Sequence, residues 1–444
     1  MRYVQNESNV TNAQTHTFRN GDPRLKWLFL DLNSYFASVE QELRPELRDR
    51  PMAVVPLLAD TTCCIAASYE AKKYGVRTGT LVGEAKRLCP GIVLVEARHQ
   101  LYVDYHHRVI EAVECCLPVT SVMSIDEMAC RLLGREQPLL AALELAREVK
   151  AAVRRKAGAT LRCSVGLAAN RYLSKVASDM EKPDGLVALT PDLLHDALAA
   201  LTPRDLPGVG ARMEKRLQQG GIQTMEQLLG LDREQLHSAW GGIGGEKLWH
   251  WLRGEDFGDL ELEHAKSIGH SHVLSPELRT PEGAYAVANK LLHKAAMRLR
   301  KGRLWAAHMT LTIRFAVGSA DAKSRHSSGI QQQPWTQSCP LLECQDNQTL
   351  VEGLQRLWSQ SPAGQSQKKP FFVGVSLGNL VPDHLHTLSL FSGLEEEGKR
   401  TRLSTTMDRV NYKYGTNTLC FASMLLAGAA APTRIAFSSI PDLF

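Results

Sequence analysis

The chain has 444 residues, of which 44% are hydrophobic and 22% are charged, and its formal net charge is +5. This length allows two to four domains with large cores, and the composition excludes a fibrous or wholly disordered protein. No apolar run approaches the roughly 20 residues of a membrane span, and no signal-peptide core is present, so we expect a cytoplasmic protein without membrane contact.

The positive charge is concentrated in one part of the chain. Residues 264–393 contain 14 Lys and Arg but only 7 Asp and Glu, a net charge of +7, so the remainder is slightly acidic. A basic module joined to an acid-bearing one favours a protein that grips a polyanion beside a metal site. A merely solvated surface is the alternative for such a cluster. The ten cysteines show no zinc-ligand spacing, and we expect them to be reduced core residues.

The N-terminal part changes abruptly from polar to apolar sequence. Residues 1–24 are rich in Asn and Thr and lack periodicity, which predicts a flexible extension. The apolar run 27–30 then predicts a buried strand, and Asp31 follows directly after it. From Phe36 onward the apolar residues follow helical spacing, so a core-facing helix is expected next.

Two further acids, Asp126 and Glu127, come where a second strand-like run, 119–123, ends. Neighbouring side chains of a strand point to opposite faces, so two acids that serve one ion fit best at a strand end or hairpin. Together with Asp31 they would concentrate negative charge, and hard oxygen ligands select Mg²⁺ or Mn²⁺. An acidic turn in solvent is the alternative interpretation.

Strands alternate with helical patterns up to about residue 189, and two strands carry acids side by side, which predicts an α/β domain with an antiparallel sheet. Asn170 is a candidate N-cap for a helix that carries Arg171 and Lys175 on one face. Further on, Leu206–Gly210 separates two helical patterns, which is typical of a helix-hairpin-helix. Its glycines would let backbone N–H groups approach a DNA phosphate, although a plain Gly-Pro turn is the alternative.

The basic module has a β-α-β-β-α-β pattern, which is typical of a split βαβ unit. The expected strands and helices are, in chain order, 267–274 (strand), 281–300 (helix), 306–315 (strand), 323–335 (strand), 348–359 (helix) and 371–377 (strand). In the C-terminal tail we expect an acidic turn at 395–397 and a strand-like segment at 418–424.

Four segments resemble, in order and spacing, the motifs of the Y-family, or translesion, DNA polymerases. They are 29–40 (first metal motif), 68–76 (fingers motif), 124–127 (second metal motif) and 163–170 continuing through 173–185 (a fourth motif). The similarity extends from about Lys26 to Phe391 and is nearest to the bacterial DNA polymerase IV (DinB) branch. Asn33 is instead similar to the UmuC branch.

The resemblance implies a multidomain fold with α+β and α/β parts, arranged as a right-hand polymerase. The expected parts are a flexible extension (1–24), a palm (25–33 and 96–189), fingers (34–95), a helical thumb with the helix-hairpin-helix (190–258), a βαββαβ little finger (264–393) and a C-terminal tail (394–444). We assign no function to the tail.

The implied activity is template-directed DNA synthesis by nucleotidyl transfer to a primer 3′-OH. Low-fidelity lesion bypass in DNA damage tolerance, as in an SOS response, is the implied role. Asp31, Asp126 and Glu127 match the catalytic residues, and with the backbone carbonyl of Leu32 they would hold two Mg²⁺ ions, with Mn²⁺ as a possible substitute.

The resemblance also implies a binding site for the incoming dNTP. Its expected residues are Tyr35, Phe36, Ser68, Tyr69, Lys72 and Lys182. Phe36 matches the steric gate, a side chain that clashes with a ribose 2′-OH. Lys72 replaces the usual Arg and so loses a bidentate fork, and Met128–Arg131 replaces an aromatic residue followed by Asp.

Primer–template DNA is the expected partner, held by its backbone. The expected DNA-binding residues are Arg171, Lys175, Gly208, Gly210 and Arg212. A short peptide with Leu388, Leu390 and Phe391 resembles a sliding-clamp motif, but Thr387 stands where Gln is expected. Residues 440–444 are a second, looser candidate for clamp binding.

Two other functions remain open from the sequence. A catalytically inactive scaffold of the same fold would bind DNA, but such members usually lose the acids that are intact here. A structure-selective nuclease could combine two metal ions with a helix-hairpin-helix, but it gives no role to Tyr69 or Lys182.

Overall fold

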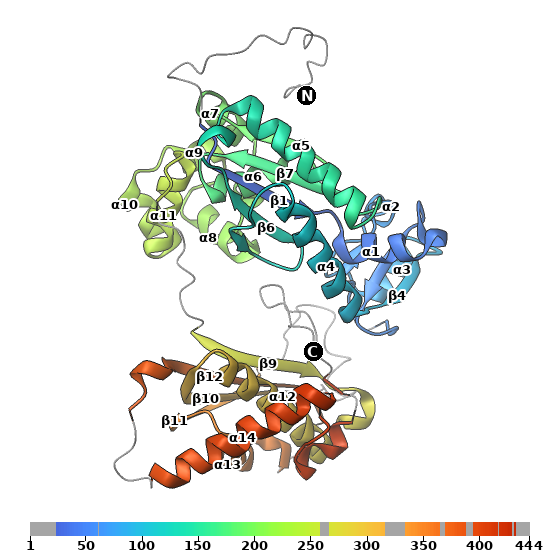
Figure 1. The fold of residues 1–444 in the computed structure, drawn as a ribbon, viewed down its shortest axis with the longest axis vertical. Coiled ribbons are helices and arrows are strands. Elements are labelled where there is room, and N and C mark those ends of the chain that lie inside the picture. Colours follow the sequence, from blue (N-terminus) through green and yellow to red (C-terminus); the bar gives the residue numbers. More distant parts are fainter. Residues whose placement is uncertain are drawn as a thin grey trace. The chain divides into compact units, whose positions relative to one another are not determined.

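The computed structural model describes residues 24–60, 62–257, 266–315, 334–364, 369–387, 394–415, 417–428 and 430–431. They form two compact units, one containing residues 24–257 and the other containing residues 266–431 (Figure 1).

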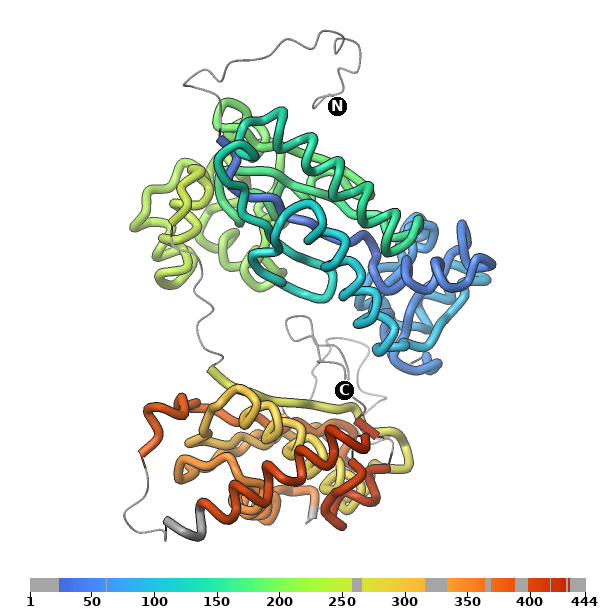
Figure 2. The backbone as a smooth tube through the Cα atoms, viewed as in Figure 1, coloured from blue at the N-terminus to red at the C-terminus, as the bar shows by residue number. Residues whose placement is uncertain are grey.

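A five-stranded sheet lies at the centre of the first unit, in the order β5-β6-β1-β7-β8. Its strands are β1 (Trp27–Leu32), β5 (Ser121–Val122), β6 (Glu127–Arg131), β7 (Cys163–Ala168) and β8 (Leu186–Leu189). β1 is antiparallel to both neighbours, whereas β7 and β8 are parallel, so the sheet is mixed rather than wholly antiparallel. β5 is also shorter than the expected strand. Figure 2 shows β1 in blue among strands from later in the chain.

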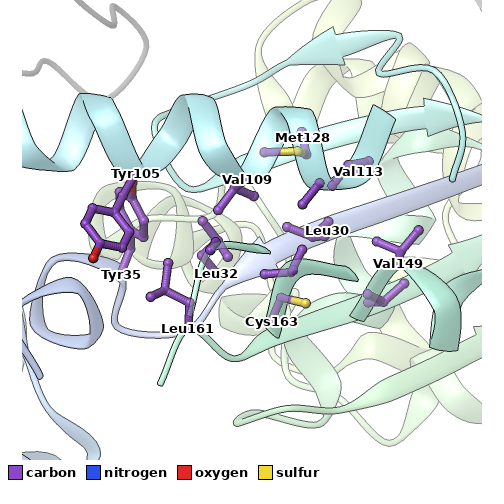
Figure 3. Packing of buried hydrophobic residues seen from close by; sticks show 14 of the residues in the cluster. Leu30, Leu32, Tyr35, Tyr105, Val109, Val113, Met128, Val149, Leu161 and Cys163 are labelled. Carbon is purple, nitrogen blue, oxygen red and sulfur yellow. The ribbon is translucent and has the colours of Figure 1, made fainter. Parts of the chain in front are cut away.

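Both faces of β1 are covered, which explains why all six of its residues are buried. On one face, Leu30 and Leu32 belong to a core with Val109 and Val113 of α4 (His99–Glu114) and Val149 of α5 (Leu139–Lys156) (Figure 3). α6 (Arg171–Met180) packs against β1, β7 and β8. Helices on both faces of a largely buried sheet define an α/β layer.

A smaller layer follows β1 and α1 (Tyr35–Leu43). It is a three-stranded sheet in the order β3-β2-β4, with its own apolar core. Its elements are β2 (Met52–Val55), β3 (Ala66–Ala67), α2 (Tyr69–Lys72), α3 (Val82–Leu88) and β4 (Val93–Glu96). This layer therefore lies between β1 and the acid-bearing β6 in sequence.

The first unit ends in a group of helices around a third core. They are α7 (Pro191–Ala199), α8 (Ala211–Gln219), α9 (Met225–Leu229), α10 (Arg233–Trp240) and α11 (Ile243–Leu252). Gly208 has a positive φ of 88° in the turn before α8, and Gly210 is the N-cap residue of that helix. The turn between two helices is thus formed as the sequence predicts.

The second unit has the expected β-α-β-β-α-β order, folded as a sheet β11-β10-β12-β9. Its elements are β9 (Ser267–Val273), α12 (Pro281–Lys301), β10 (Leu304–Phe315), β11 (Trp335–Cys344), α13 (Asn347–Ser359) and β12 (Pro370–Pro382). Of the strand expected at 323–335, only the last two residues are described, and Trp335 is in a strand. β11 begins at Trp335 and contains Pro340, which an edge strand tolerates, while 316–333 lie outside the described residues.

The C-terminal tail differs most from expectation. The residues expected to form an acidic turn, 395–397, lie instead within α14 (Leu394–Tyr414). The strand-like segment at 418–424 instead leads into a 3₁₀ helix, Ala422–Ala427, which packs on α12. Its apolar residues serve the second unit's core and do not pair as a strand.

An ion pair fastens α14 to this unit. Arg300 donates from Nε and Nη2 to the two carboxylate oxygens of Asp408, at 2.6 and 2.8 Å. Arg300 also donates to the carbonyl of Gln345 at 2.6 Å.

Two further expectations concern the whole chain. The cysteines were expected to be core residues, but Cys63 and Cys115 are exposed, whereas Cys64, Cys89, Cys130 and Cys163 are buried. Within the described ranges, no helix combines the length and apolar character needed to span a bilayer.

We predict that Asp408→Ala lowers the free energy of unfolding of the second unit by about 3 kcal/mol, because it leaves the nearly buried Arg300 guanidinium without its counterion. Urea denaturation of the full chain measures this change. The exposed neighbour Arg409 provides the matched control, and Arg409→Ala should shift stability by less than about 0.5 kcal/mol. Equal effects of the two substitutions would contradict a structural role for the ion pair.

Candidate active site

Asp31 ends a row of side chains on one face of β1. Trp27 and Phe29 precede it at the two-residue spacing of a strand, so all three share the face that α6 covers. The guanidinium carbon of Arg171 lies 5.8 Å from the Trp27 ring centroid, and Nζ of Lys175 lies 5.4 Å from that of Phe29. Arg171 and Lys175, one helical turn apart on α6, therefore lie over successive side chains of this β1 face. This placement brings Lys175 to the buried carboxylate of Asp31.

β6 places two further carboxylates next to Asp31. Glu127 is its Cα partner in the antiparallel ladder, and Asp126 precedes Glu127 in the hairpin after β5. The backbone N–H of Leu32 donates to the carbonyl of Asp126 at 2.8 Å and holds this hairpin against β1. The two acids thus lie at a hairpin, in agreement with the sequence-based expectation.

The neighbouring acids change the pKa of Asp126. Burial, together with the negative charges of Asp31 and Glu127, raises the pKa of Asp126 to about 6. Ser124 opposes this shift, because its hydroxyl donates to Oδ1 of Asp126 at 2.6 Å. The same hydroxyl oxygen lies 3.2 Å from Oε2 of Glu127, so one serine serves both acids.

Two lysines neutralise the acids. Nζ of Lys175 lies 2.5 Å from Asp31 and 2.7 Å from Glu127, and Nζ of Lys182 lies 2.7 Å from Asp31. Asp179 contacts both lysines, at 3.0 and 2.7 Å. Burial by itself would lower the pKa of Lys175, but the surrounding carboxylates outweigh it and raise that pKa. Lys175 is thus held charged among the acids.

The carboxylates of Asp31, Asp126 and Glu127 are the type of ligand that a hard divalent cation requires. Carboxylate oxygens are the ligands that Mg²⁺ and Mn²⁺ prefer. Among the described residues, no three His, Cys, Asp or Glu side chains converge as ligands of one ion. The ammonium of Lys175 instead bridges Asp31 and Glu127, and it supplies the positive charge that such a cation would bring.

α2 adds a phenol and a further lysine to the surroundings of Asp31. Ser68 is buried and caps α2 by accepting a backbone N–H at 3.3 Å, so its observed contacts are structural. Nζ of Lys72 lies 4.2 Å from the ring centroid of Tyr69. Burial and, to a smaller extent, the negative charge of Asp31 raise the pKa of Tyr69 to about 12. Burial also lowers the pKa of Lys72, and the like charge of Lys182 acts in the same direction.

The two aromatic residues that begin α1 have different environments. Tyr35 is buried, and its hydroxyl donates to the backbone carbonyl of Tyr102 at 2.5 Å. Phe36 is only partly buried, and its ring stacks on the ring of Tyr102 with centroids 4.5 Å apart. Of the pair, only Phe36 has a partly exposed ring.

A buried polar network, which sequence reasoning missed, fastens the loop that carries Lys182. Asn33 accepts the backbone N–H of Asp184 at 2.7 Å and donates to the hydroxyl of Ser164 at 3.1 Å. Ser164 in turn donates to the carbonyl of Glu181 at 3.2 Å. Asn33 thus ties β1 to both ends of this loop, which explains why a neutral amide with a donor and an acceptor suits the position.

Two other residues of the site were also missed. Ser124 could have been inferred from its place beside the acids, and Asp179 from its position four residues after Lys175 on one helix face.

The expected DNA-binding residues of the hairpin before α8 lie on an open surface. A Cβ atom built at Gly208 or Gly210 would meet nothing within 4 Å, and Arg212 is exposed. The clamp-like residues Leu388, Leu390 and Phe391, and residues 440–444, lie outside the described part of the chain.

Comparisons with known proteins agree with this site. Profiles of the impB/mucB/samB family match residues 30–179 and, for its C-terminal domain, 265–390, and a profile of the DNA polymerase-iota thumb domain matches residues 204–256. DNA polymerase IV of Moorella thermoacetica is 32% identical over 396 residues, which cover 87% of this chain and 93% of that protein. DNA polymerase IV 1 of Bacillus subtilis is 28% identical over 394 residues, covering 87% of this chain and 90% of that protein.

Solved structures show the same fold. A Dbh–Dpo4 chimera of Y-family DNA polymerases superposes with a TM-score of 0.67 at 22% identity, covering 80% of this chain and 99% of the chimera. An insertion ternary complex of Dbh DNA polymerase has the same identity and coverage and a TM-score of 0.54.

The chain therefore belongs to the impB/mucB/samB family, which comprises the Y-family, or translesion, DNA polymerases. Its relatives at about 30% identity over most of the chain are DNA polymerase IV enzymes, so it is a DNA-directed DNA polymerase of that type. The right-hand polymerase fold inferred from the sequence is confirmed.

We predict that Gly166→Ala displaces α6 and its lysine from the site. A Cβ at residue 166 of β7 would lie 2.0 Å from the carbonyl oxygen of Ser174 and 2.4 Å from the backbone nitrogen of Ser178, and backbone cannot yield cheaply. The free energy of unfolding should fall by about 3 kcal/mol, as measured by urea denaturation.

Gly210→Ala is the control for this substitution, because a Cβ there meets no atom within 4 Å. Its stability should stay within about 0.5 kcal/mol of wild type. A Gly166→Ala protein as stable as that control would show that α6 is free to move away from β7.

Proposed function

We propose that the chain extends a primer on a DNA template with Asp31, Asp126 and Glu127 as ligands of two Mg²⁺ ions and with the carbonyl of Leu32 as a further ligand. The observation that carries this proposal is the pairing of Asp31 with Glu127 across the β1–β6 ladder, with Asp126 next to it in the hairpin. Three acids held this close by backbone pairing are stable only with neighbouring positive charge.

Two such ions, when bound, lower the pKa of the primer hydroxyl and neutralise the leaving pyrophosphate. The protein's part is to hold the acids ready. The hairpin hydrogen bond to Leu32 and the hydroxyl of Ser124 fix Asp126. Its pKa near 6 leaves Asp126 mostly ionised at neutral pH, as a cation ligand must be.

Lys182, Lys72 and Tyr69 are the groups that we propose for the triphosphate of the incoming dNTP. A phosphate near Lys182 would compete with Asp31 for the ammonium and form charge-assisted hydrogen bonds with it. Lys72 lies close enough to Lys182 for their positive charges to repel each other. An anion bound between the two ammonium groups would offset this repulsion.

We propose that primer–template DNA is held by its phosphates at two places. One is the open turn with Gly208, Gly210 and Arg212, where a helix N-terminus faces outward. The other is the basic second unit.

Lesion bypass in DNA damage tolerance is the biological role that the polymerase IV relatives favour. Clamp binding through 388–391, a cytoplasmic location and the domain boundaries of the sequence analysis stay predictions.

One assay distinguishes the polymerase from the two alternative functions, a nuclease and an inactive DNA-binding scaffold. Primer extension that requires Mg²⁺ on a labelled primer–template supports the polymerase. Degradation of the DNA would indicate a nuclease, and binding without either reaction an inactive scaffold. The nuclease hypothesis gives no role to the Tyr69–Lys72 pair beside the acids.

We predict that Asp126→Asn reduces primer extension by about a thousandfold or more while DNA binding is retained, because the neutral amide is a weak ligand for a hard cation. Single-turnover extension and a filter-binding assay measure the two properties. Asp192→Asn, in the exposed first turn of α7, is the control and should extend primers like wild type. Activity of Asp126→Asn within about tenfold of wild type would remove Asp126 from the proposed ligands.

We predict that Phe36→Ala raises ribonucleotide incorporation by orders of magnitude and costs much less in deoxynucleotide use. The ring is partly exposed on the first turn after Asp31, where it can exclude a 2′-OH. Comparing kcat/KM for dNTP and rNTP measures the effect. Val39→Ala, which removes a buried side chain of the same helix, is the control and should keep wild-type sugar selectivity.

A further inference from the structure

The selectivity of a steric gate depends on how firmly the gate is held. A clash with a 2′-OH discriminates only by the free energy needed to move the clashing ring, and an unsupported aromatic side chain can change rotamer at small cost. The ring of Phe36 is supported from behind by Tyr102, with centroids 4.5 Å apart and planes inclined by 22°. Tyr102 itself is fully buried in α4, so it cannot retreat into solvent.

Tyr102 is fixed at both its ends. Its hydroxyl donates to Oε1 of Glu40 at 2.9 Å, and its backbone carbonyl accepts the hydroxyl of Tyr35 at 2.5 Å. Glu40 and Tyr35 both belong to α1, the helix that carries Phe36. The gate and its support are therefore joined by hydrogen bonds as well as by stacking.

Glu40 is in turn held in one position. It has no solvent exposure, and Arg98 donates to it from Nε at 3.0 Å and from Nη2 at 2.5 Å. A buried carboxylate with a bidentate guanidinium partner and a phenol donor has little freedom to move, because each lost bond would leave a buried charge unsatisfied. Arg98 and Tyr102 come from one end of α4, far from α1 in sequence.

We propose that Tyr102 is a positioning residue that sets the sugar selectivity of the polymerase by holding Phe36 in place, with Glu40 and Arg98 anchoring its hydroxyl. This inference rests on the proposed role of Phe36. Nothing in the motifs around the acids points to Tyr102, because its effect passes through another side chain. Tyr102 does not touch the reacting atoms, so its loss should change the choice of sugar more than the rate of DNA synthesis.

The test compares Tyr102→Leu with Tyr105→Leu in the full chain. Both remove a buried phenol ring from α4, but the stacked partner of Phe36 is Tyr102. Tyr102→Leu should lower the ratio of kcat/KM for dNTP over rNTP by about tenfold, the order of an aromatic stacking contact, and change kcat/KM for dNTP less than about threefold. Tyr105→Leu should leave the ratio unchanged.

A double-mutant cycle with Phe36→Ala shows whether Tyr102 acts through the gate. In the Phe36→Ala background, Tyr102→Leu should have no further effect on the ratio. An additive effect, an unchanged ratio in the single variant, or an equal loss with both sugars would each overturn the inference. If Phe36→Ala itself leaves selectivity unchanged, the proposed gate fails, and the inference fails with it.

Tyr102→Phe is the second variant, for the case that Tyr102→Leu does not fold. It keeps the stacked ring and removes only the hydrogen bond to Glu40. The dNTP over rNTP ratio should fall by about fivefold, the order of one such hydrogen bond. A wild-type ratio in a folded Tyr102→Phe protein would exclude the anchoring by Glu40.

Discussion

The active site depends on the repulsion between three carboxylates that backbone pairing holds together. Asp31 and Glu127 cannot separate, because they are opposite residues of one ladder, and Asp126 is fixed by the hairpin. The charge must therefore be balanced from outside the sheet. α6 and the loop after it supply two ammonium groups for this purpose. The close contact of α6 with β7 at Gly166 and the Asn33 network both position that positive charge.

This arrangement also explains the role of the smaller sheet. The segment between β1 and β6 includes α1, α2 and α4, so Phe36, Tyr69 and Lys72 all come from one continuous part of the chain. Phe36 lies at its beginning and Tyr102 near its end. The stacking of these two rings joins the two ends of this segment.

Much of this could be predicted from sequence, because the relevant patterns are local. The apolar run before Asp31, the hairpin at Asp126 and the cap at Asn170 each follow from a few neighbouring residues, and the structure has all three. The contacts of Lys175 and Tyr102 could not be predicted, since they depend on which face of a helix meets which strand or helix. The continuation of β11 from Trp335 to Cys344 was not predicted, because Pro340 and its polar neighbours lack the apolar pattern of a strand.

The tail folded on α12 and α13 has a consequence for how this chain can be shortened. The family profile ends at residue 390, before α14 begins at Leu394. A protein cut at that point would lose Asp408 and leave the nearly buried guanidinium of Arg300 without its carboxylate. It would also lose the carbonyl of Gly428, which accepts from the buried Lys290 at 2.7 Å. For this chain, the folded boundary of the second unit lies beyond the end of the match to the family profile.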